Sequence, residues 1–186
     1  MPSGKPEGIG FDSVQVETNK QHDENRYLNP WYIPFIESRL IKTVPQKFPV
    51  VIAIIDDGFN VTNSTLKPFL YQNSRDIINS FDDDANSYKD DFTGWDISDD
   101  DAAVNPPKDK LKEYYHGTYL SGIIIRVLKS CDGEKASTYF KILPVKAISD
   151  RERLTYIKDG YKAMEYALAM HADIVCCAWG SNVMKA

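Results

Sequence analysis

The chain has 186 residues and a formal net charge of −5, with 42% hydrophobic and 26% charged residues. This composition indicates a soluble globular domain that is long enough to bury a core. No apolar run approaches the ~18 residues that a membrane span needs, and no cluster of Lys and Arg forms the footprint of a nucleic-acid-binding protein.

Residues 1–26 are polar and rich in Gly, Lys, Asp and Asn, which predicts a flexible N-terminal arm. The first residues contain no apolar core, so we expect no secretory signal in the visible sequence. Residues 27–186 are expected to form a single folded unit, and a short helix is predicted over 36–41.

The following part of the chain alternates between apolar runs and helical patterns, and residues 60–110 between them are rich in loop-forming residues. Strand, helix, strand, helix, strand is the order of an α/β fold with a parallel sheet and right-handed crossovers. The predicted elements are a strand over 49–55, a helix over 117–129, a strand over 142–148, a helix with the apolar stripe Ile157, Tyr161, Met164 and Leu168, and a strand over 173–179.

In such sheets, functional residues gather at the carboxyl ends of the strands. Asp56 follows the first predicted strand, His116 opens the helix predicted over 117–129, and Trp179 ends the last strand. A buried carboxylate that accepts a hydrogen bond from an imidazole fixes its tautomer and stabilises the imidazolium. Asp56 and His116 are therefore candidates for the orienting acid and the base of a catalytic triad.

Four motifs in this order resemble those of the subtilisin-like serine proteases, the subtilases. Residues 51–58 (VIAIIDDG) resemble the strand that ends in the triad aspartate, and residues 116–122 (HGTYLSG) resemble the motif of the triad histidine. Residues 142–146 (ILPVK) resemble the next core strand, and residues 172–181 (ADIVCCAWGS) resemble the strand whose backbone pairs with the substrate.

The resemblance implies a three-layer subtilisin-like fold, with residues 27–186 as the N-terminal part of a catalytic domain that is incomplete in this chain. It implies catalytic roles for Asp56 and His116, and substrate binding by Ala178, Trp179 and Gly180. Peptides or proteins would be the substrates. Because subtilases are mostly exported, it also implies an extracytoplasmic location.

The family's nucleophilic serine and oxyanion-hole asparagine belong to motifs that this sequence does not contain. Without a nucleophile no acyl-enzyme forms. We therefore expect both groups to come from a second polypeptide or from a further segment of a longer enzyme. The alternative is a catalytically inactive relative that binds peptides or a partner. A third interpretation is a subunit of a larger assembly that docks through its acidic segment.

That acidic segment has nine Asp and one Lys between positions 82 and 101, which favours cations as ligands. It is similar to an insert found in many bacterial subtilases. Oxygen ligands at alternate positions are typical of a calcium loop, and the candidates are Asp82, Asp84, Asn86, the carbonyl of Tyr88, and Asp90. The other interpretation is a solvated loop that keeps its shape through Asx turns.

Tyr119 and Ala178 differ from the family pattern without removing a triad group, and two further differences bear on the proposed sites. Ser87 stands where the loop normally has Gly, and a positive φ there costs Ser more than Gly. Asp57 stands where Ser or Thr usually follows the triad aspartate. A second carboxylate beside His116 favours the protonated imidazole, which is a poor base, and the effect is small if Asp57 faces solvent.

Overall fold

The computed structural model of the protein describes residues 49–110, 113–152, 156–157 and 159–180. The arm predicted over 1–26 and the helix predicted over 36–41 lie outside the described residues.

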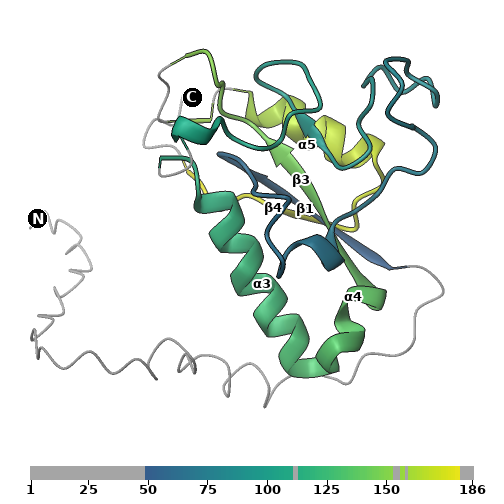
Figure 1. Ribbon diagram of the computed structural model, residues 1–186, viewed down its shortest axis with the longest axis vertical. Helices are drawn as coiled ribbons and strands as arrows, with labels where there is room; N and C mark the ends of the chain where they lie inside the picture. Colours follow the sequence, from purple (N-terminus) through teal and green to yellow (C-terminus); the bar gives the residue numbers. More distant parts are fainter. Residues whose placement is uncertain (1–48, 111–112, 153–155, 158, 181–186) are drawn as a thin grey trace, which may run out of the picture. The chain divides into compact units, whose positions relative to one another are not determined.

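A parallel sheet of four strands forms the centre of the fold (Figure 1), in the order β2-β3-β1-β4. This confirms the α/β class and the parallel sheet expected from the sequence. β1 lies between β3 and β4, so it is the strand best shielded from solvent, as its continuous apolar run predicts. The strands are β1 (Val50–Asp56), β2 (Trp95–Asp96), β3 (Phe140–Lys146) and β4 (Ile174–Cys176).

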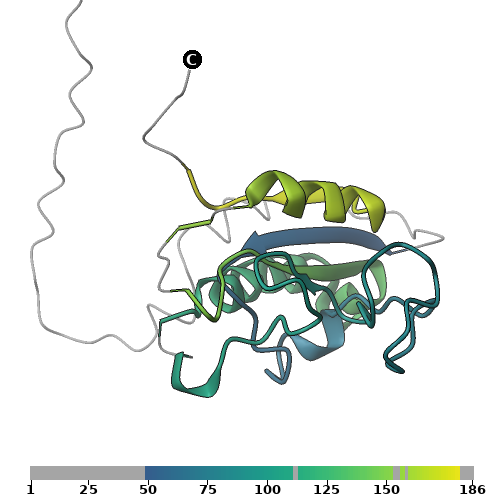
Figure 2. The ribbon, with the colours of Figure 1, turned by 90° about the horizontal axis from the view of Figure 1, so that it is seen from above.

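Helices cover both faces of the sheet, which makes three layers (Figure 2). α5 (Gly160–Ala169) lies on one face, and α3 (His116–Asp132) and α4 (Ala136–Tyr139) lie on the other. Three short 3-10 helices connect these elements, η1 (Lys67–Phe69), η2 (Lys108–Lys110) and η3 (Gly133–Lys135). None of the helices in the described ranges has the length and apolarity needed to cross a membrane.

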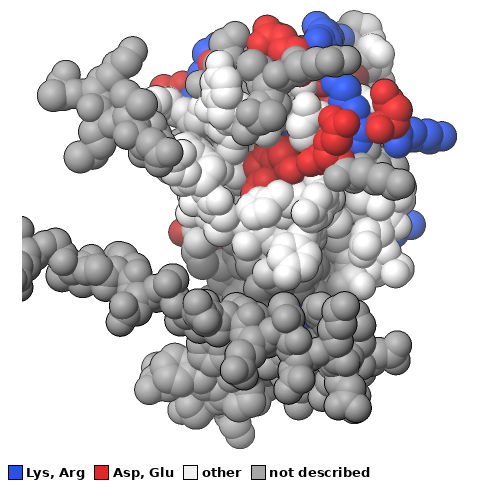
Figure 3. Space-filling model, turned by 90° about the vertical axis from the view of Figure 1, so that its left-hand side faces the viewer, with Lys and Arg blue, Asp and Glu red and all other residues white. Residues whose placement is uncertain are grey.

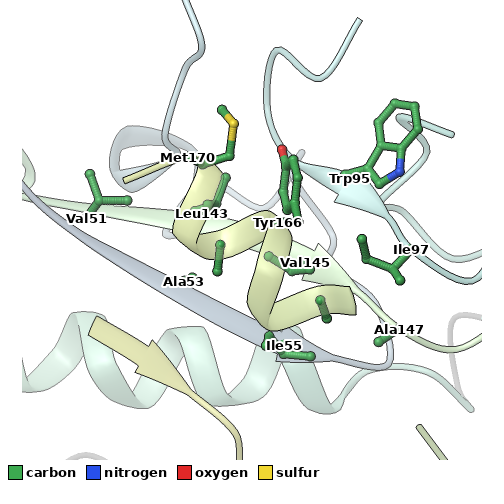
Figure 4. Close-up of a cluster of buried hydrophobic side chains, with 12 residues drawn as sticks. Val51, Ala53, Ile55, Trp95, Ile97, Leu143, Val145, Ala147, Tyr166 and Met170 are labelled. Atoms are coloured by element: carbon green, nitrogen blue, oxygen red, sulfur yellow. The ribbon is translucent and has the colours of Figure 1, made fainter. Parts of the chain in front are cut away.

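Alternate residues of β1 build two separate cores, because successive side chains of a strand point to opposite faces. Val51, Ala53 and Ile55 belong to the cluster under α5 (Figure 4). Ile52 and Ile54 belong to the cluster under α3. Both clusters hold the strand that ends at Asp56, so the position of this residue is fixed from both sides.

The helix predicted after residue 157 is present as α5, but the predicted apolar stripe is only half correct, since Ile157 and Met164 pack against the core and the other two residues do not. Tyr161 is 86% exposed and Leu168 is 66% exposed. The buried face instead consists of Ala163, Tyr166 and Ala167. Small alanines let the helix backbone approach the sheet closely. Ile157 and Met164 of the stripe are partly buried and pack at the edge of this core.

Two strands also differ in extent from the prediction. The last strand was expected over 173–179, but β4 ends at Cys176, because its pairing with β1 stops at the Ile54–Cys176 pair. β2 falls within the stretch read as loop, and its two residues are too few to show a period in the sequence.

Candidate active site

The carboxyl ends of β1 and β3 point toward the same side of the sheet, where α3 begins (Figure 1). On this side the surface shows acidic side chains next to Lys and Arg side chains, beside a broad uncharged area (Figure 3). Ligands of parallel α/β sheets bind outside the carboxyl ends of the strands. A ligand-binding or catalytic site is therefore expected on this side of the sheet.

Asp56 and His116, which are 60 positions apart in the sequence, lie within hydrogen-bond distance there. The Nδ1 atom of His116 is 2.9 Å from Oδ2 and 3.0 Å from Oδ1 of Asp56. Asp56 is the last residue of β1 and His116 is the first residue of α3. The parallel sheet and the crossover between these elements bring the two side chains together.

The two partners differ in their exposure to solvent. The Asp56 side chain is 5% exposed, whereas that of His116 is 50% exposed. No described residue forms a hydrogen bond with Nε2 of His116. A buried carboxylate on Nδ1 and an accessible Nε2 are the arrangement in which an imidazole accepts a proton from an incoming group.

Asp57 is buried and both of its carboxylate oxygens accept backbone N–H groups from the start of α3. Oδ2 accepts from His116 at 3.1 Å and Oδ1 accepts from Gly117 at 2.9 Å. Burial raises the pKa of Asp57, although these two hydrogen bonds lower it. The side chain therefore does not face solvent, which was one of the two placements considered from the sequence.

Gly117 is required by the close approach of α3 to the turn after β1. A Cβ atom at Gly117 would lie 2.6 Å from the carbonyl oxygen of Gly58 and 3.0 Å from Cβ of Asp56. The next residue, Thr118, accepts the backbone N–H of Asn60 through Oγ1 at 2.8 Å. The His-Gly-Thr sequence thus joins the histidine to the aspartate strand through a tightly fitted contact.

Ala178, Trp179 and Gly180 are exposed and follow the end of β4. The indole Nε1 of Trp179 donates a hydrogen bond to the carbonyl of Ile55 at 3.0 Å, one residue before Asp56. A Cβ atom on Gly160 would lie 2.6 Å from Cη2 of the same indole. The orientation of Trp179 is thus fixed by β1 on one side and by the start of α5 on another.

Residues 76–91 form a loop, called the acidic loop below. In it, the carboxylates of Asp76, Asp82 and Asp84 each offer an oxygen within 4.8 Å of the others. The side chain of Asp84 is only 5% exposed, and its buried Oδ1 atom accepts no hydrogen bond from the described residues. A buried carboxylate oxygen without a donor fits a cation ligand. Sequence reasoning missed Asp76, because it lies six positions before the acidic segment.

The other residues expected as ligands are placed differently. Oδ1 of Asp90 accepts the backbone N–H groups of Asn79 and Ser80 at 2.7 and 2.8 Å. Oδ1 of Asn86 accepts the N–H of Tyr88 at 2.7 Å. Asp82 and Asp76 accept backbone N–H groups in the same way, so the difference is that Asp90 is not part of the carboxylate cluster.

The acidic loop also contains the strained backbone that the sequence suggested at position 87. Ser87 has a φ of 75°, and its N–H donates to Oδ2 of Asp82 at 2.8 Å. Ala85 has a φ of 56°, although it has no polar side chain to compensate. The loop is thus held in a conformation that glycine would adopt at lower cost.

A second acidic cluster, which the sequence reasoning did not find, contains a buried lysine. Asp96, Asp99 and Asp150 bring their oxygens together. The fully buried Lys146 contacts the carboxylates of Asp96 and Asp150. These two carboxylates raise the pKa of Lys146 against the effect of burial. Here an ammonium group of the protein itself lies between two of the carboxylates and offsets part of their charge.

Comparison with known proteins agrees with this geometry. The family model described as the subtilase family matches residues 49–186. The chain is 28% identical over 127 residues, 67% of its length, to subtilisin-like protease 1 of Plasmodium falciparum isolate 3D7 and to that of Plasmodium vivax. These residues span only 17% and 19% of the two relatives, so the chain covers less than a fifth of their length.

Proposed function

The chain belongs to the subtilase family, and on that premise we propose that it is the part of a serine endopeptidase that provides the aspartate and the histidine of the triad. Membership supports a serine-protease type of function at the level of the family. The observation that supports the finer proposal most is the contact between Nδ1 of His116 and the buried carboxylate of Asp56.

Asp56 accepts the Nδ1–H of His116 and so keeps Nε2 unprotonated and ready to act as a base. Nε2 takes the proton of the serine hydroxyl as its oxygen attacks the peptide carbonyl. The imidazolium, stabilised by Asp56, then gives this proton to the leaving amine as the peptide bond breaks. Water attacks the acyl-enzyme by the same route and releases the acid product.

The nucleophilic serine and the oxyanion-hole asparagine are proposed to come from outside these 186 residues, on the same or on a second polypeptide. The much greater length of the relatives is consistent with this. Ser121 does not fill the role, because its buried hydroxyl donates to the carbonyl of Gly117 at 2.7 Å. It lies in the second turn of α3.

Peptides or proteins are the proposed substrates. The exposed backbone of Ala178, Trp179 and Gly180 follows the edge strand β4 and is free to pair with an extended peptide as an added strand. Trp179, with its indole held by Ile55, would form a wall of one side-chain subsite. An extracytoplasmic location is proposed from the resemblance to exported proteases.

Calcium is the proposed structural cofactor of the acidic loop. Asp76, Asp82 and Asp84 would hold it, because their oxygens converge and one of them is buried without a hydrogen-bond donor. Calcium prefers carboxylate and carbonyl oxygens. The ion would relieve the repulsion of these carboxylates and fix the loop on α5, where Tyr166 donates to Asp91 at 3.0 Å.

The proposal is tested by peptide hydrolysis with the full-length protein and any co-purifying polypeptide. We expect hydrolysis by the wild type, and at least a 10⁴-fold loss of kcat in His116→Ala, since removing a triad member abolishes most of the acceleration. Asp109→Ala, which removes an exposed acid of η2, is the control and should keep the wild-type rate. Binding of peptides without hydrolysis would favour the non-catalytic alternative.

A further inference from the structure

We propose that Asp57 is a positioning residue, which anchors the first turn of α3 and thereby holds the imidazole of His116 on Asp56. The role rests on the proposed function, in that a displaced imidazole matters only if His116 acts as the base. Asp57 itself touches neither the substrate nor the imidazole in this account. It acts through the backbone of His116, whose N–H group it accepts.

Asp57 forms hydrogen bonds with both proposed triad residues, which also contact each other. Its carboxylate accepts the backbone N–H of His116 at 3.1 Å and that of Gly117 at 2.9 Å. Its own N–H donates to Oδ1 of Asp56 at 2.7 Å. Oδ1 and Oδ2 of Asp56 in turn hold Nδ1 of His116. Displacement of any one of the three residues strains the contacts of the other two.

The start of α3 depends on this side chain, because the residue that precedes the helix supplies no side-chain cap. A helix leaves its first four N–H groups without partners. The residue before His116 is Tyr115, and its side chain makes no capping hydrogen bond. Asp57, from the end of β1, satisfies two of these groups and places its negative charge at the positive end of the helix dipole.

The carboxylate of Asp57 is directed at the backbone of α3 and not at the imidazole, although its charge lies close to the proposed triad. Both oxygens are engaged by backbone N–H groups and not by the imidazole. The charge is therefore directed at the helix N-terminus, where it is favourable. A hydroxyl at this position would offer one oxygen atom, whereas the carboxylate presents a separate oxygen to each of the two N–H groups.

The packing around Gly117 transmits any change directly to the imidazole. The Cβ position of Gly117 is only 2.6 Å from the carbonyl oxygen of Gly58 and 3.0 Å from Cβ of Asp56. A shift of the first turn toward β1 would therefore bring the backbone of Gly117 against these atoms. A misplacement of about 1 Å costs on the order of 10²-fold in rate.

The test uses the full-length protein with any co-purifying polypeptide, and compares Asp57→Ala with Asp57→Ser. We expect kcat to fall about 10²-fold in Asp57→Ala, with KM within about threefold. Asp57→Ser keeps one acceptor and should recover about a tenth of the wild-type kcat. Asp109→Ala is again the control for loss of an acid. An unchanged kcat in Asp57→Ala, or an equal loss in both variants, would overturn the proposal.

Amide hydrogen exchange provides a second readout that does not need activity. The amides of His116 and Gly117 should exchange at least tenfold faster in Asp57→Ala, while the amide of Ile54 in β1 keeps its protection. Unchanged exchange at both amides would contradict the anchoring role. If Ile54 also loses protection, the Ala variant is misfolded, and the same comparison is then made with Asp57→Ser.

The two proposals fail in different ways. A wild-type protein that hydrolyses no peptide contradicts the proposed function. The anchoring role is then still decided by whether the amides of His116 and Gly117 exchange faster in Asp57→Ala than in the wild type. An active wild type whose kcat does not depend on Asp57 leaves the function intact and contradicts the positioning role alone.

Discussion

Nδ1 of His116, the first residue of α3, lies 2.9 Å from Oδ2 of Asp56, the last residue of β1. The contact joins two elements that are separated by a long, loop-rich segment. It exists because β1 is packed on both faces and because Gly117 lets the helix approach the strand end.

Replacing Asp56 with Asn keeps the size of the side chain but removes the charge that fixes the imidazole tautomer. We expect kcat of the full-length protein to fall about 10⁴-fold, with little change in thermal stability. Steady-state hydrolysis of a peptide measures this. Wild-type turnover in Asp56→Asn would exclude Asp56 from the catalytic machinery.

The calcium proposal predicts that a chelator lowers the thermal unfolding midpoint of the full-length protein. Added Ca²⁺ should restore the midpoint, because a ligand of the folded state stabilises it by mass action. Asp84→Asn should abolish this response, whereas Asp83→Asn, at an exposed neighbour in the loop, should retain it. A midpoint that is insensitive to the chelator in the wild type would contradict a calcium site.

Ser87 has a φ of 75°, so glycine is expected to be more stable than serine at this position. Ser87→Gly should raise the free energy of unfolding by about 1 kcal/mol, the order of the left-handed penalty for a non-glycine residue. Ser74→Gly, at an exposed position without a positive φ, should lower it slightly. Denaturant unfolding of both variants measures the difference, and a destabilised Ser87→Gly would contradict the strain.

Lys146→Met should destabilise the fold by about 3–5 kcal/mol, because it leaves the carboxylate of Asp96 buried without its partner. Burial already raises the pKa of Asp96 to about 6, and Lys146 lowers it. Without the lysine this pKa rises further, so the folded variant favours protonated Asp96. Its stability is then best below the unfolded pKa of 3.8 and is lost as the pH rises.

Urea unfolding at pH 4 and at pH 8 tests the predicted direction in which the stability of Lys146→Met changes with pH. The deficit of Lys146→Met relative to the wild type should be larger at pH 8. A double variant that also changes Asp96 to Leu should recover most of the loss at both pH values. A deficit that is larger at pH 4 would contradict the account of this buried pair.

The orientation of Trp179 predicts an effect of Gly160→Ala on substrate preference. The added methyl group would overlap the indole, whose nearest atom is 2.6 Å from the Cβ position. We expect kcat/KM to change by at least tenfold for some peptides and little for others. Gly122→Ala, where a Cβ meets nothing within 4 Å, is the control. A uniform change across a peptide series would contradict a subsite at Trp179.

The sequence predicts the elements whose pattern is local. The apolar run of β1 and the helical spacing after His116 both appear at the expected places. Asp56 and His116 could be proposed from strand and helix ends together with the family motifs. These signals need no knowledge of how distant parts of the chain meet.

The features that the sequence does not predict depend on contacts across the chain. The direction of Asp57 is decided by the approach of the α3 N-terminus. Asp76 joins the acidic cluster only because the loop folds back on itself. Nothing in the local sequence around Lys146 indicates that it is buried. Its partner Asp96 lies beside it only because β2 pairs with β3 in the sheet.

The most direct test of the central claim is labelling of the native preparation with a fluorophosphonate probe, which reacts with an activated serine. Intact masses and peptide mapping of every polypeptide then locate the label. The account predicts one labelled serine outside residues 1–186, and loss of labelling in His116→Ala. An unlabelled wild type, or labelling that persists in His116→Ala, would contradict a triad built on Asp56 and His116.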